Sequence, residues 1–253
     1  MTRRIATFSV ALALSASAAV LGATAVMAAA PAHVAAAVAD AARPQADKDL
    51  DATRKPAELL TFTGLKPGDK VIDLMPGRGY TTRLFAKTVG ASGKVYALAP
   101  PAFAERMKGV AGDPAFPNIT FLAQELTAIA PPEKVDMVWT SQNYHDLASP
   151  PREGRPAMDI AGFNKAVFNA LKPGGIYVIT DHRAAAGTPA AEIPNLHRID
   201  PAMVKAQVLA AGFVLAGESD ALKVATDDHT KPNSDNAVRG NTDKFVLKFR
   251  KPA

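Results

Sequence analysis

The sequence of 253 residues contains no cysteine. This absence excludes a disulfide framework, a thiol nucleophile and a lipid-modified cysteine. Aromatic residues make up only 6%, and core packing accounts for the single tryptophan, Trp139, inside an apolar run. The chain also lacks a basic tract with interleaved aromatic residues, so nucleic acid is not an expected partner. At 48% hydrophobic and 21% charged residues, the composition is that of a globular protein with one sizeable domain.

Charged residues are absent from position 5 to position 28. Arg3 and Arg4 precede this run, and small residues end it at Ala28, which predicts a secretory signal peptide over residues 1–28. The alternative is a retained transmembrane anchor, because the run is long enough to span a bilayer. The arginine pair also leaves twin-arginine export open, although the usual aromatic residue and lysine do not follow it. Cleavage would lower the formal net charge from +5 to +3 and leave a periplasmic or secreted protein without membrane association.

The remainder of the chain predicts an alternation of strands and helices. Residues 29–47, rich in alanine with two prolines, are expected to form a flexible lead-in to one domain over residues 48–253. Apolar runs predict strands at 71–74, 94–98, 119–122, 135–140, 175–180, 213–216 and 245–249. Helical patterns lie between them: from 49 to before Gly64, and at 80–89, 102–110, 160–171 and 201–211. This alternation indicates an α/β domain with a mostly parallel sheet. The long polar segment 219–242 is expected to be functional or disordered.

The stretch VIDLMPGRGY, residues 71–80, runs from the first predicted strand into a glycine turn. In an open parallel sheet, ligands bind beyond the carboxyl ends of the strands. A dinucleotide fingerprint would require a third glycine where Thr82 stands and an acid at the end of the next strand, which ends instead in Ala99. A nicotinamide cofactor is therefore not expected. A plain strand-to-helix turn is the structural alternative.

Several strand ends taken together resemble the class I S-adenosylmethionine-dependent methyltransferases. The resemblance rests on LMPGRGY (74–80), NYHD (143–146), LKPGG (171–175), DHRA (181–184) and LHRID (196–200), and covers about residues 45–250. The sequence is most similar to a bacterial branch of predicted exported methyltransferases. The resemblance implies a Rossmann-like, seven-stranded, mostly parallel sheet with an antiparallel last strand and helices on both faces. It also implies S-adenosylmethionine as the cofactor.

The same resemblance assigns roles at the cofactor site. Gly77 and Gly79 would pass beneath the methionine part of the cofactor. Asp73 would organise the loop or, through water, contact the cofactor's ammonium group. Glu125 would accept a hydrogen bond from the adenine amino group, although an exposed loop acid is an equally simple explanation. Met75 and Tyr80 complete the expected cofactor-binding residues.

Two positions depart from the family pattern. Met75 stands where the family usually has its first glycine, and Ala99 stands where it usually has a ribose-binding acid. Without that acid, binding would forgo about 1.5–3 kcal/mol of charge-assisted hydrogen bonding. The loss corresponds to a roughly ten- to hundred-fold weaker cofactor affinity.

Four histidines fall at or beyond predicted strand ends, each with an acid nearby: His145, His182, His197 and His229. The predicted catalytic residues are His145, Asp146, Asp181 and His182, with His145 as a base that an aspartate orients. The alternative is a divalent metal held by His145, Asp181 and His182. No His-x-x-x-His spacing supports it, so no metal is expected. Each loop histidine could also be an ordinary surface residue.

These observations predict a methyltransferase that acts on a small molecule or an envelope component. Methyl transfer requires mainly the alignment of nucleophile, methyl group and sulfur. The alternative is a non-catalytic exported binding protein that keeps the methyltransferase fold, because a fold does not dictate a function.

Overall fold

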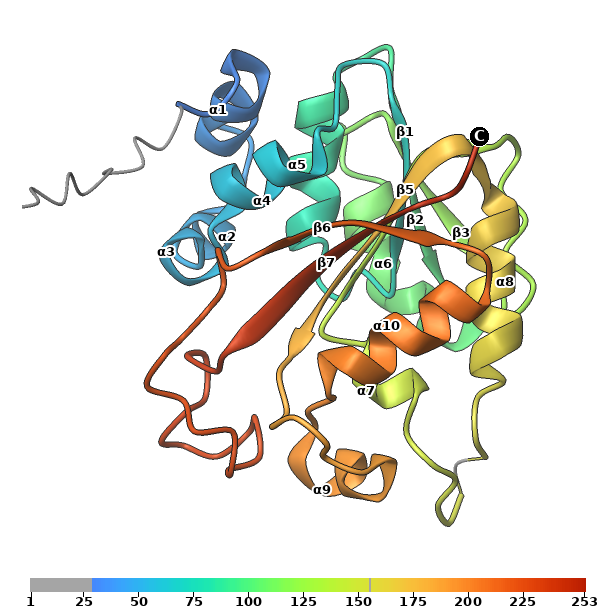
Figure 1. Ribbon diagram of the computed structural model, residues 1–253. Helices are drawn as coiled ribbons and strands as arrows, with labels where there is room; N and C mark the ends of the chain where they lie inside the picture. Colours follow the sequence, from blue (N-terminus) through green and yellow to red (C-terminus); the bar gives the residue numbers. More distant parts are fainter. Residues whose placement is uncertain (1–28, 155) are drawn as a thin grey trace, which may run out of the picture.

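The computed structural model describes residues 29–154 and 156–253, so the predicted signal peptide lies outside the described residues. Its centre is a seven-stranded sheet in the order β3-β2-β1-β4-β5-β7-β6 (Figure 1). The β7 strand runs antiparallel to both β5 and β6, and the other pairings are parallel. The predicted fold class is confirmed. The strands are β1 (Lys70–Leu74), β2 (Lys94–Ala99), β3 (Ile119–Ala123), β4 (Val135–Ser141), β5 (Leu171–His182), β6 (Val214–Ser219) and β7 (Lys244–Arg250).

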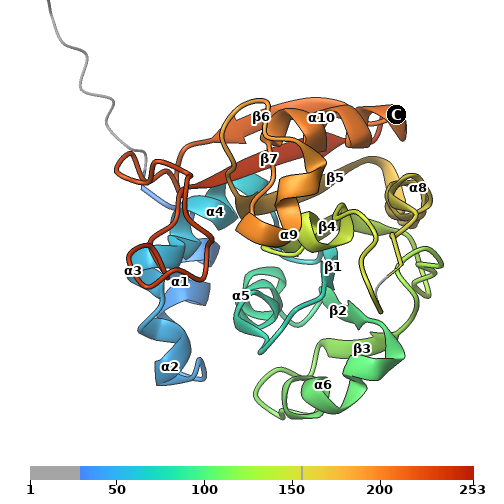
Figure 2. The same cartoon turned by 90° about the horizontal axis from the view of Figure 1, so that it is seen from below.

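Helices cover both faces of this sheet (Figures 1 and 2). The face with α1, α4, α5 and α6 has one apolar core, and the face with α8 and α10 has the other. In β1, Val71 belongs to the first core and Ile72 to the second, as expected for a parallel strand that is buried on both faces. The helices are α1 (Ala32–Ala39), α2 (Gln45–Lys48), α3 (Asp51–Arg54), α4 (Pro56–Thr63), α5 (Tyr80–Val89), α6 (Ala104–Ala111), α7 (Tyr144–Leu147), α8 (Ile160–Ala170), α9 (Ile193–Leu196) and α10 (Pro201–Ala210), with short 3₁₀ turns at Pro101–Phe103 and Ala190–Glu192.

Helix boundaries follow local capping chemistry. The carboxylate of Asp200 accepts a hydrogen bond from the backbone N–H of Ala202, and Pro201 takes the first position of α10. Asp159 accepts in the same way from Gly162 at the start of α8. Such caps satisfy backbone N–H groups that have no partner within the helix.

The first described segment differs from the expectation of a flexible lead-in. Within residues 29–47 lie α1 and the start of α2, and Val34 and Ala37 of α1 are buried against the domain. The helix expected from Asp49 is also divided, because Lys55 adopts a left-handed φ of 48° and Pro56 begins α4. Proline lacks the N–H that would continue a helix, so it favours a new start.

Residues 220–243, between β6 and β7, contain neither helix nor strand. Figure 2 shows this segment (red) near α3, and both contribute residues to one cavity described below. Within residues 29–154 and 156–253, no helix is long and apolar enough to cross a membrane.

Candidate functional site

The glycine turn after β1 borders a cavity of about 340 Å³ at the carboxyl edge of the sheet. Met75, Gly77 and Tyr80 are among the predicted cofactor-binding residues that line it. Further lining residues come from β1, from residues 141–143 at the end of β4, and from α2 and α3. This position, beyond the ends of parallel strands, is where ligands bind in open α/β sheets.

The two glycines of the turn have different surroundings. Gly77 has a φ of 58°, is exposed on the cavity wall, and has open space where a Cβ would stand. Gly79 has a φ of 81° and is buried, and a Cβ there would lie 2.7 Å from a Val110 methyl carbon. Gly77 therefore adds no side chain to the cavity wall, whereas Gly79 allows α5 to pack closely on α6.

Asp73, at the end of β1, organises the start of α5. Its carboxylate accepts hydrogen bonds from the hydroxyl groups of Thr81 at 2.9 Å and Thr82 at 2.7 Å. Burial raises the pKa of Asp73 to about 7, although both threonine hydroxyls act in the opposite direction. These contacts fix the turn to the start of α5, and the role in cofactor binding that the resemblance implies for Asp73 stays a prediction.

Met75 is held in an unusual conformation. Its φ is 51°, its N–H donates to the carbonyl of Leu98 at 2.8 Å, and its own carbonyl accepts from the Asn143 side chain at 3.3 Å. Its side chain packs partly against the core. A left-handed backbone here explains why the family pattern has glycine, since few other residues adopt it easily.

Near the ends of β2 and β3, the residues expected to contact the ribose and the adenine are poorly suited to these roles. Ala99 is buried at the end of β2 and offers no polar side chain. Glu125 is exposed in the loop after β3 and does not line the cavity at the glycine turn. The residues present thus fit the methionine part of S-adenosylmethionine, through the open space at Gly77. They offer no charged acceptor for the ribose at Ala99.

The N-terminal helices close the other side of this cavity, which the sequence analysis missed. The Tyr80 hydroxyl donates to Asp51 of α3 at 2.7 Å, and Arg43 forms two hydrogen bonds with the same carboxylate. The Arg54 guanidinium lies 4.4 Å from the centre of the Tyr80 ring. The Tyr80–Asp51 contact joins positions 29 residues apart, so no local pattern in the sequence announces it.

A second cavity of about 150 Å³ adjoins the first and shares a wall with it. The shared wall is formed by Leu50, Arg54, Tyr80, Thr81, Ser141 and Gln142. The second cavity is also lined by residues that do not line the first. These include His182, Trp139 and Lys244, and Leu222 and Gly240 of the segment between β6 and β7. None of the described residues that line this cavity carries a carboxylate, whereas two cationic residues, Arg54 and Lys244, do line it.

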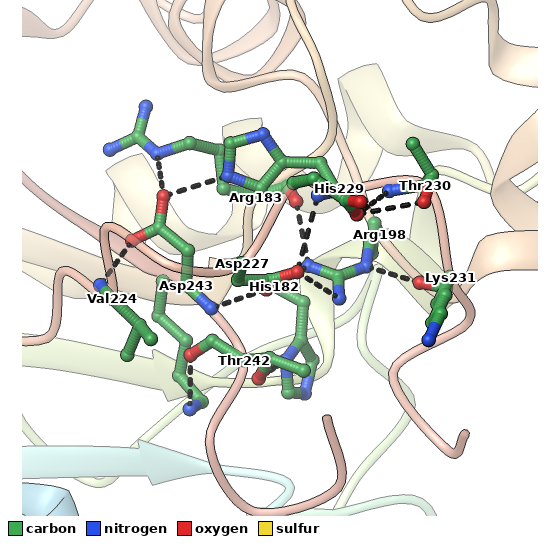
Figure 3. Close-up of polar contacts among 12 residues, drawn as sticks. His182, Arg183, Arg198, Val224, Asp227, His229, Thr230, Lys231, Thr242 and Asp243 are labelled. Atoms are coloured by element: carbon green, nitrogen blue, oxygen red, sulfur yellow. Dashed lines mark hydrogen bonds and ion pairs between the residues drawn. The ribbon is translucent and has the colours of Figure 1, made fainter. Parts of the chain in front are cut away.

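A polar network holds the segment 220–243 beside this cavity (Figure 3). The fully buried Arg198 forms two hydrogen bonds with Asp227, at 2.8 and 3.1 Å, and a third with the carbonyl of Lys231. Asp243 accepts from Arg183 at 3.0 Å and contacts His229 at 2.9 Å. The segment that was expected to be functional or disordered is therefore fixed to the domain by buried charges.

His182 is attached to the end of this segment. Its Nδ1 lies 2.7 Å from the Thr242 hydroxyl oxygen (Figure 3), and His182 also lines the second cavity. Burial lowers the pKa of His182 to about 4, against the opposing charge of Asp181. The ring is accordingly neutral near pH 7 and offers a nitrogen lone pair, but a pKa of about 4 makes it a weak base.

His145 has a different environment. Its Nδ1 and its backbone N–H both contact the fully buried carboxylate of Asp181, at 2.7 and 2.8 Å. Burial alone would raise the pKa of Asp181, but the charge and hydrogen bonds of His145 hold it below its ordinary value. His145 is 3% exposed and lines neither of the two cavities.

The side chains of Asp146 and His197 lie close to His145. Its Nε2 is 3.6 Å from a carboxylate oxygen of Asp146, and the other oxygen of Asp146 is 4.0 Å from Nδ1 of His197. The predicted catalytic residues are thus near one another but divided: His182 faces the second cavity, while His145 and Asp146 face His197. His197 was not among the predicted catalytic residues, although the sequence placed it on the ligand-binding side.

A comparison with known protein families shows the family to which this chain belongs. A family model described as "Methyltransferase domain" matches residues 65–229, which run from just before β1 into the segment beside the second cavity. The chain belongs to this family. The predicted methyltransferase is therefore confirmed, and a binding protein without catalytic activity is not favoured.

Solved structures agree with the fold of this methyltransferase. An S-adenosylmethionine-dependent methyltransferase from Aquifex aeolicus shares 21% identity, with 82% of this chain and 98% of that chain covered and a TM-score of 0.53. A putative sarcosine dimethylglycine methyltransferase from Galdieria sulphuraria shares 18%, with 82% and 86% covered and a TM-score of 0.57. An S-adenosylmethionine-dependent methyltransferase from Mesorhizobium loti shares 17%, with 80% and 100% covered and a TM-score of 0.54. No curated protein matches the sequence.

Proposed function

We propose that this methyltransferase uses S-adenosylmethionine to methylate a small molecule that carries an anionic group. The observation that carries the proposal is the pair of adjoining cavities, one over the glycine turn and one beside His182. A methyltransferase needs a site for the methyl donor and a site for the acceptor, and two cavities with a common wall provide both. Methyl transfer is then a task of alignment across that wall.

The first cavity would hold the methyl donor. S-adenosylmethionine, when bound, supplies an electrophilic methyl group on a sulfonium. Gly77 leaves space for close approach of the donor to the backbone, and Asp73 fixes the turn by accepting from Thr81 and Thr82. Tyr80 ties the turn to α3 through Asp51, which closes the cavity on that side.

The second cavity would hold the acceptor. Its volume of about 150 Å³ lies below the roughly 300–1,000 Å³ of pockets for drug-sized ligands, so the acceptor is small. Burial, and then the charge of Arg54, lower the pKa of Lys244. Two cations that face one cavity without a carboxylate in its lining favour a ligand with a carboxylate or phosphate group.

His182 would receive the proton of the acceptor. Its Nδ1 is occupied by the Thr242 hydroxyl, which leaves Nε2 as the ring nitrogen available to a ligand. The sequence predicted His145 as the base, but its burial away from both cavities favours His182 for this role. The acceptor atom is then an oxygen or nitrogen that loses a proton when it gains the methyl group.

The test is a labelling experiment with trideuteromethyl S-adenosylmethionine and a small-molecule extract of the native compartment. We expect formation of S-adenosylhomocysteine together with a labelled anionic product detected by mass spectrometry. Lys244→Gln should lower product formation, whereas Lys248→Gln, on the same strand but bonded to the carbonyl of Phe62, should not. Absence of S-adenosylmethionine binding at millimolar concentration would refute the proposal, and a cationic or neutral product would refute the proposed acceptor class.

We also propose that the enzyme acts after export, in the periplasm or outside the cell, as a member of an exported branch of its family. The uncharged run from position 5 to position 28 and the two arginines before it support this proposal. Cell fractionation and mass spectrometry of the purified N-terminus test it. An intact N-terminus in the cytoplasmic fraction would overturn it.

A further inference from the structure

We propose that His145, Asp146 and His197 form a binding site for one divalent transition-metal ion such as Zn²⁺. Nitrogen and oxygen donor atoms of these three side chains lie within 4.8 Å of one another. The site is separate from the two cavities, whose linings contain none of the three residues. It does not depend on the proposed acceptor or on the identity of the methyl donor.

The first argument is the way in which Asp181 fixes His145. The carboxylate of Asp181 accepts from the backbone N–H of His145 and contacts its Nδ1, so a neutral His145 ring would carry its proton on Nδ1 and could offer the Nε2 lone pair to an ion. Metal-binding histidines usually donate their second ring N–H to a carboxylate in this manner, which sets the tautomer and the ring orientation. The lone pair of His145 Nε2 is directed to the side where Asp146 lies, 3.6 Å away.

The second argument is the conformation of His197. This residue ends α9 with a φ of 47°, which is uncommon for a residue other than glycine. Its position is fixed from the next residue, because Arg198 is fully buried and bonded to Asp227. As a result the His197 ring meets the His145 ring edge to face, with centroids 5.7 Å apart.

The third argument is the spacing of the donor atoms. Bonds of about 2.0–2.1 Å to a tetrahedral zinc ion separate neighbouring donor atoms by about 3.3 Å. The two Asp146 oxygens lie 3.6 Å from His145 Nε2 and 4.0 Å from His197 Nδ1, and all three donor atoms lie within 4.8 Å of one another, so the set has to contract by up to about 1.5 Å around an ion. The buried His145 would stay in place, while Asp146 and His197, with side chains 39% and 37% exposed, can turn toward the ion.

The donor set also selects the class of metal. Two imidazoles and one carboxylate suit zinc, manganese, iron or cobalt in their divalent states, whereas calcium and magnesium prefer oxygen donors alone. Three protein ligands leave at least one coordination position for water or a ligand. The structure thus replaces the ligand set considered from sequence: Asp181 supports His145 from behind, and His182 is bonded to Thr242.

Cobalt titration of the untagged full chain tests this site. We expect one equivalent of Co²⁺ per chain, seen as visible d–d absorption, and competition by one equivalent of Zn²⁺ measured by elemental analysis. Asp146→Asn and His197→Asn should each raise the Kd for Co²⁺ by about tenfold or more. Asparagine is chosen at position 197 because it tolerates the left-handed backbone.

His33→Gln is the matched control, because His33 belongs to α1, where its Nε2 lies 2.9 Å from the carbonyl oxygen of Leu65. It should keep the wild-type Kd, and circular dichroism melting should show that all three variants are folded. The proposal is overturned if the wild type binds no stoichiometric Co²⁺ or Zn²⁺ near neutral pH. It is also overturned if the folded Asp146→Asn and His197→Asn variants bind Co²⁺ as the wild type does.

Discussion

Gly77 and Gly79 are two residues apart, yet we expect alanine at each to damage a different property of the enzyme. Both have a left-handed φ, and an alanine there costs about 1–2 kcal/mol of backbone strain. At Gly79 the new Cβ would also stand 2.7 and 2.8 Å from the two methyl carbons of Val110, where about 3.5–4.0 Å is normal. Such overpacking costs about 1–3 kcal/mol more. Gly79→Ala should therefore lower the free energy of unfolding by about 2–5 kcal/mol, and Gly77→Ala by only about 1–2 kcal/mol.

Cofactor affinity should show the opposite order. The Cβ of Gly77→Ala meets no protein atom within 4 Å and would occupy the cavity itself. We expect it to weaken S-adenosylmethionine binding by about tenfold or more, equivalent to at least about 1.4 kcal/mol. Urea unfolding measures the stability of both variants, and isothermal titration at a temperature where both are folded measures their affinity. Equal losses of stability, or an unchanged affinity in Gly77→Ala, would refute the separation of roles.

Three further changes test other contacts. In the folded protein the pKa of Asp73 is about 7, against an ordinary value of 3.8. The free energy of unfolding of the wild type should therefore fall by up to about 4 kcal/mol as the pH rises from about 4 to 7. Asp73→Asn should remove this dependence from urea unfolding curves, and an unchanged slope would contradict it. Asp227→Asn leaves Arg198 buried without its counter-charge and should lower the free energy of unfolding by about 3–5 kcal/mol. The matched change at the exposed Asp228, Asp228→Asn, should alter the free energy of unfolding by no more than about 0.5 kcal/mol. Tyr80→Phe removes the hydrogen bond to Asp51, worth about 1.5–3 kcal/mol, and should speed proteolysis of residues 29–63; an unchanged cleavage rate would count against this docking contact.

Features with a local cause could be predicted from the sequence. The α5 helix matches its predicted range because Gly79 and Gly90 flank it, and α10 begins at the predicted cap, Asp200, followed by Pro201. Each strand of the sheet was expected from its apolar run. The signals of these elements lie within a few residues of the element, so a single sequence is sufficient to locate them.

The candidate site was harder to predict because its decisive contacts are distant in sequence. Asp181 reaches back 36 positions to His145, and Arg198 reaches forward 29 positions to Asp227. The sequence identified most of these residues as polar groups at strand ends, but not which of them meet. The N-terminal helices were missed for a similar reason, since alanine-rich α1 has little amphipathic pattern and is stabilised by burial of Val34 and Ala37.

The place of β7 in the sheet sets the order in which this enzyme can become active. This strand is the last in the chain, yet it lies between β5 and β6 and carries Lys244 to the second cavity. Until residues 244–250 have left the ribosome, β5 and β6 have no strand between them. We therefore expect the complete sheet, and with it the second cavity lined by Lys244, to form only once the C-terminal strand is available to pair with β5 and β6.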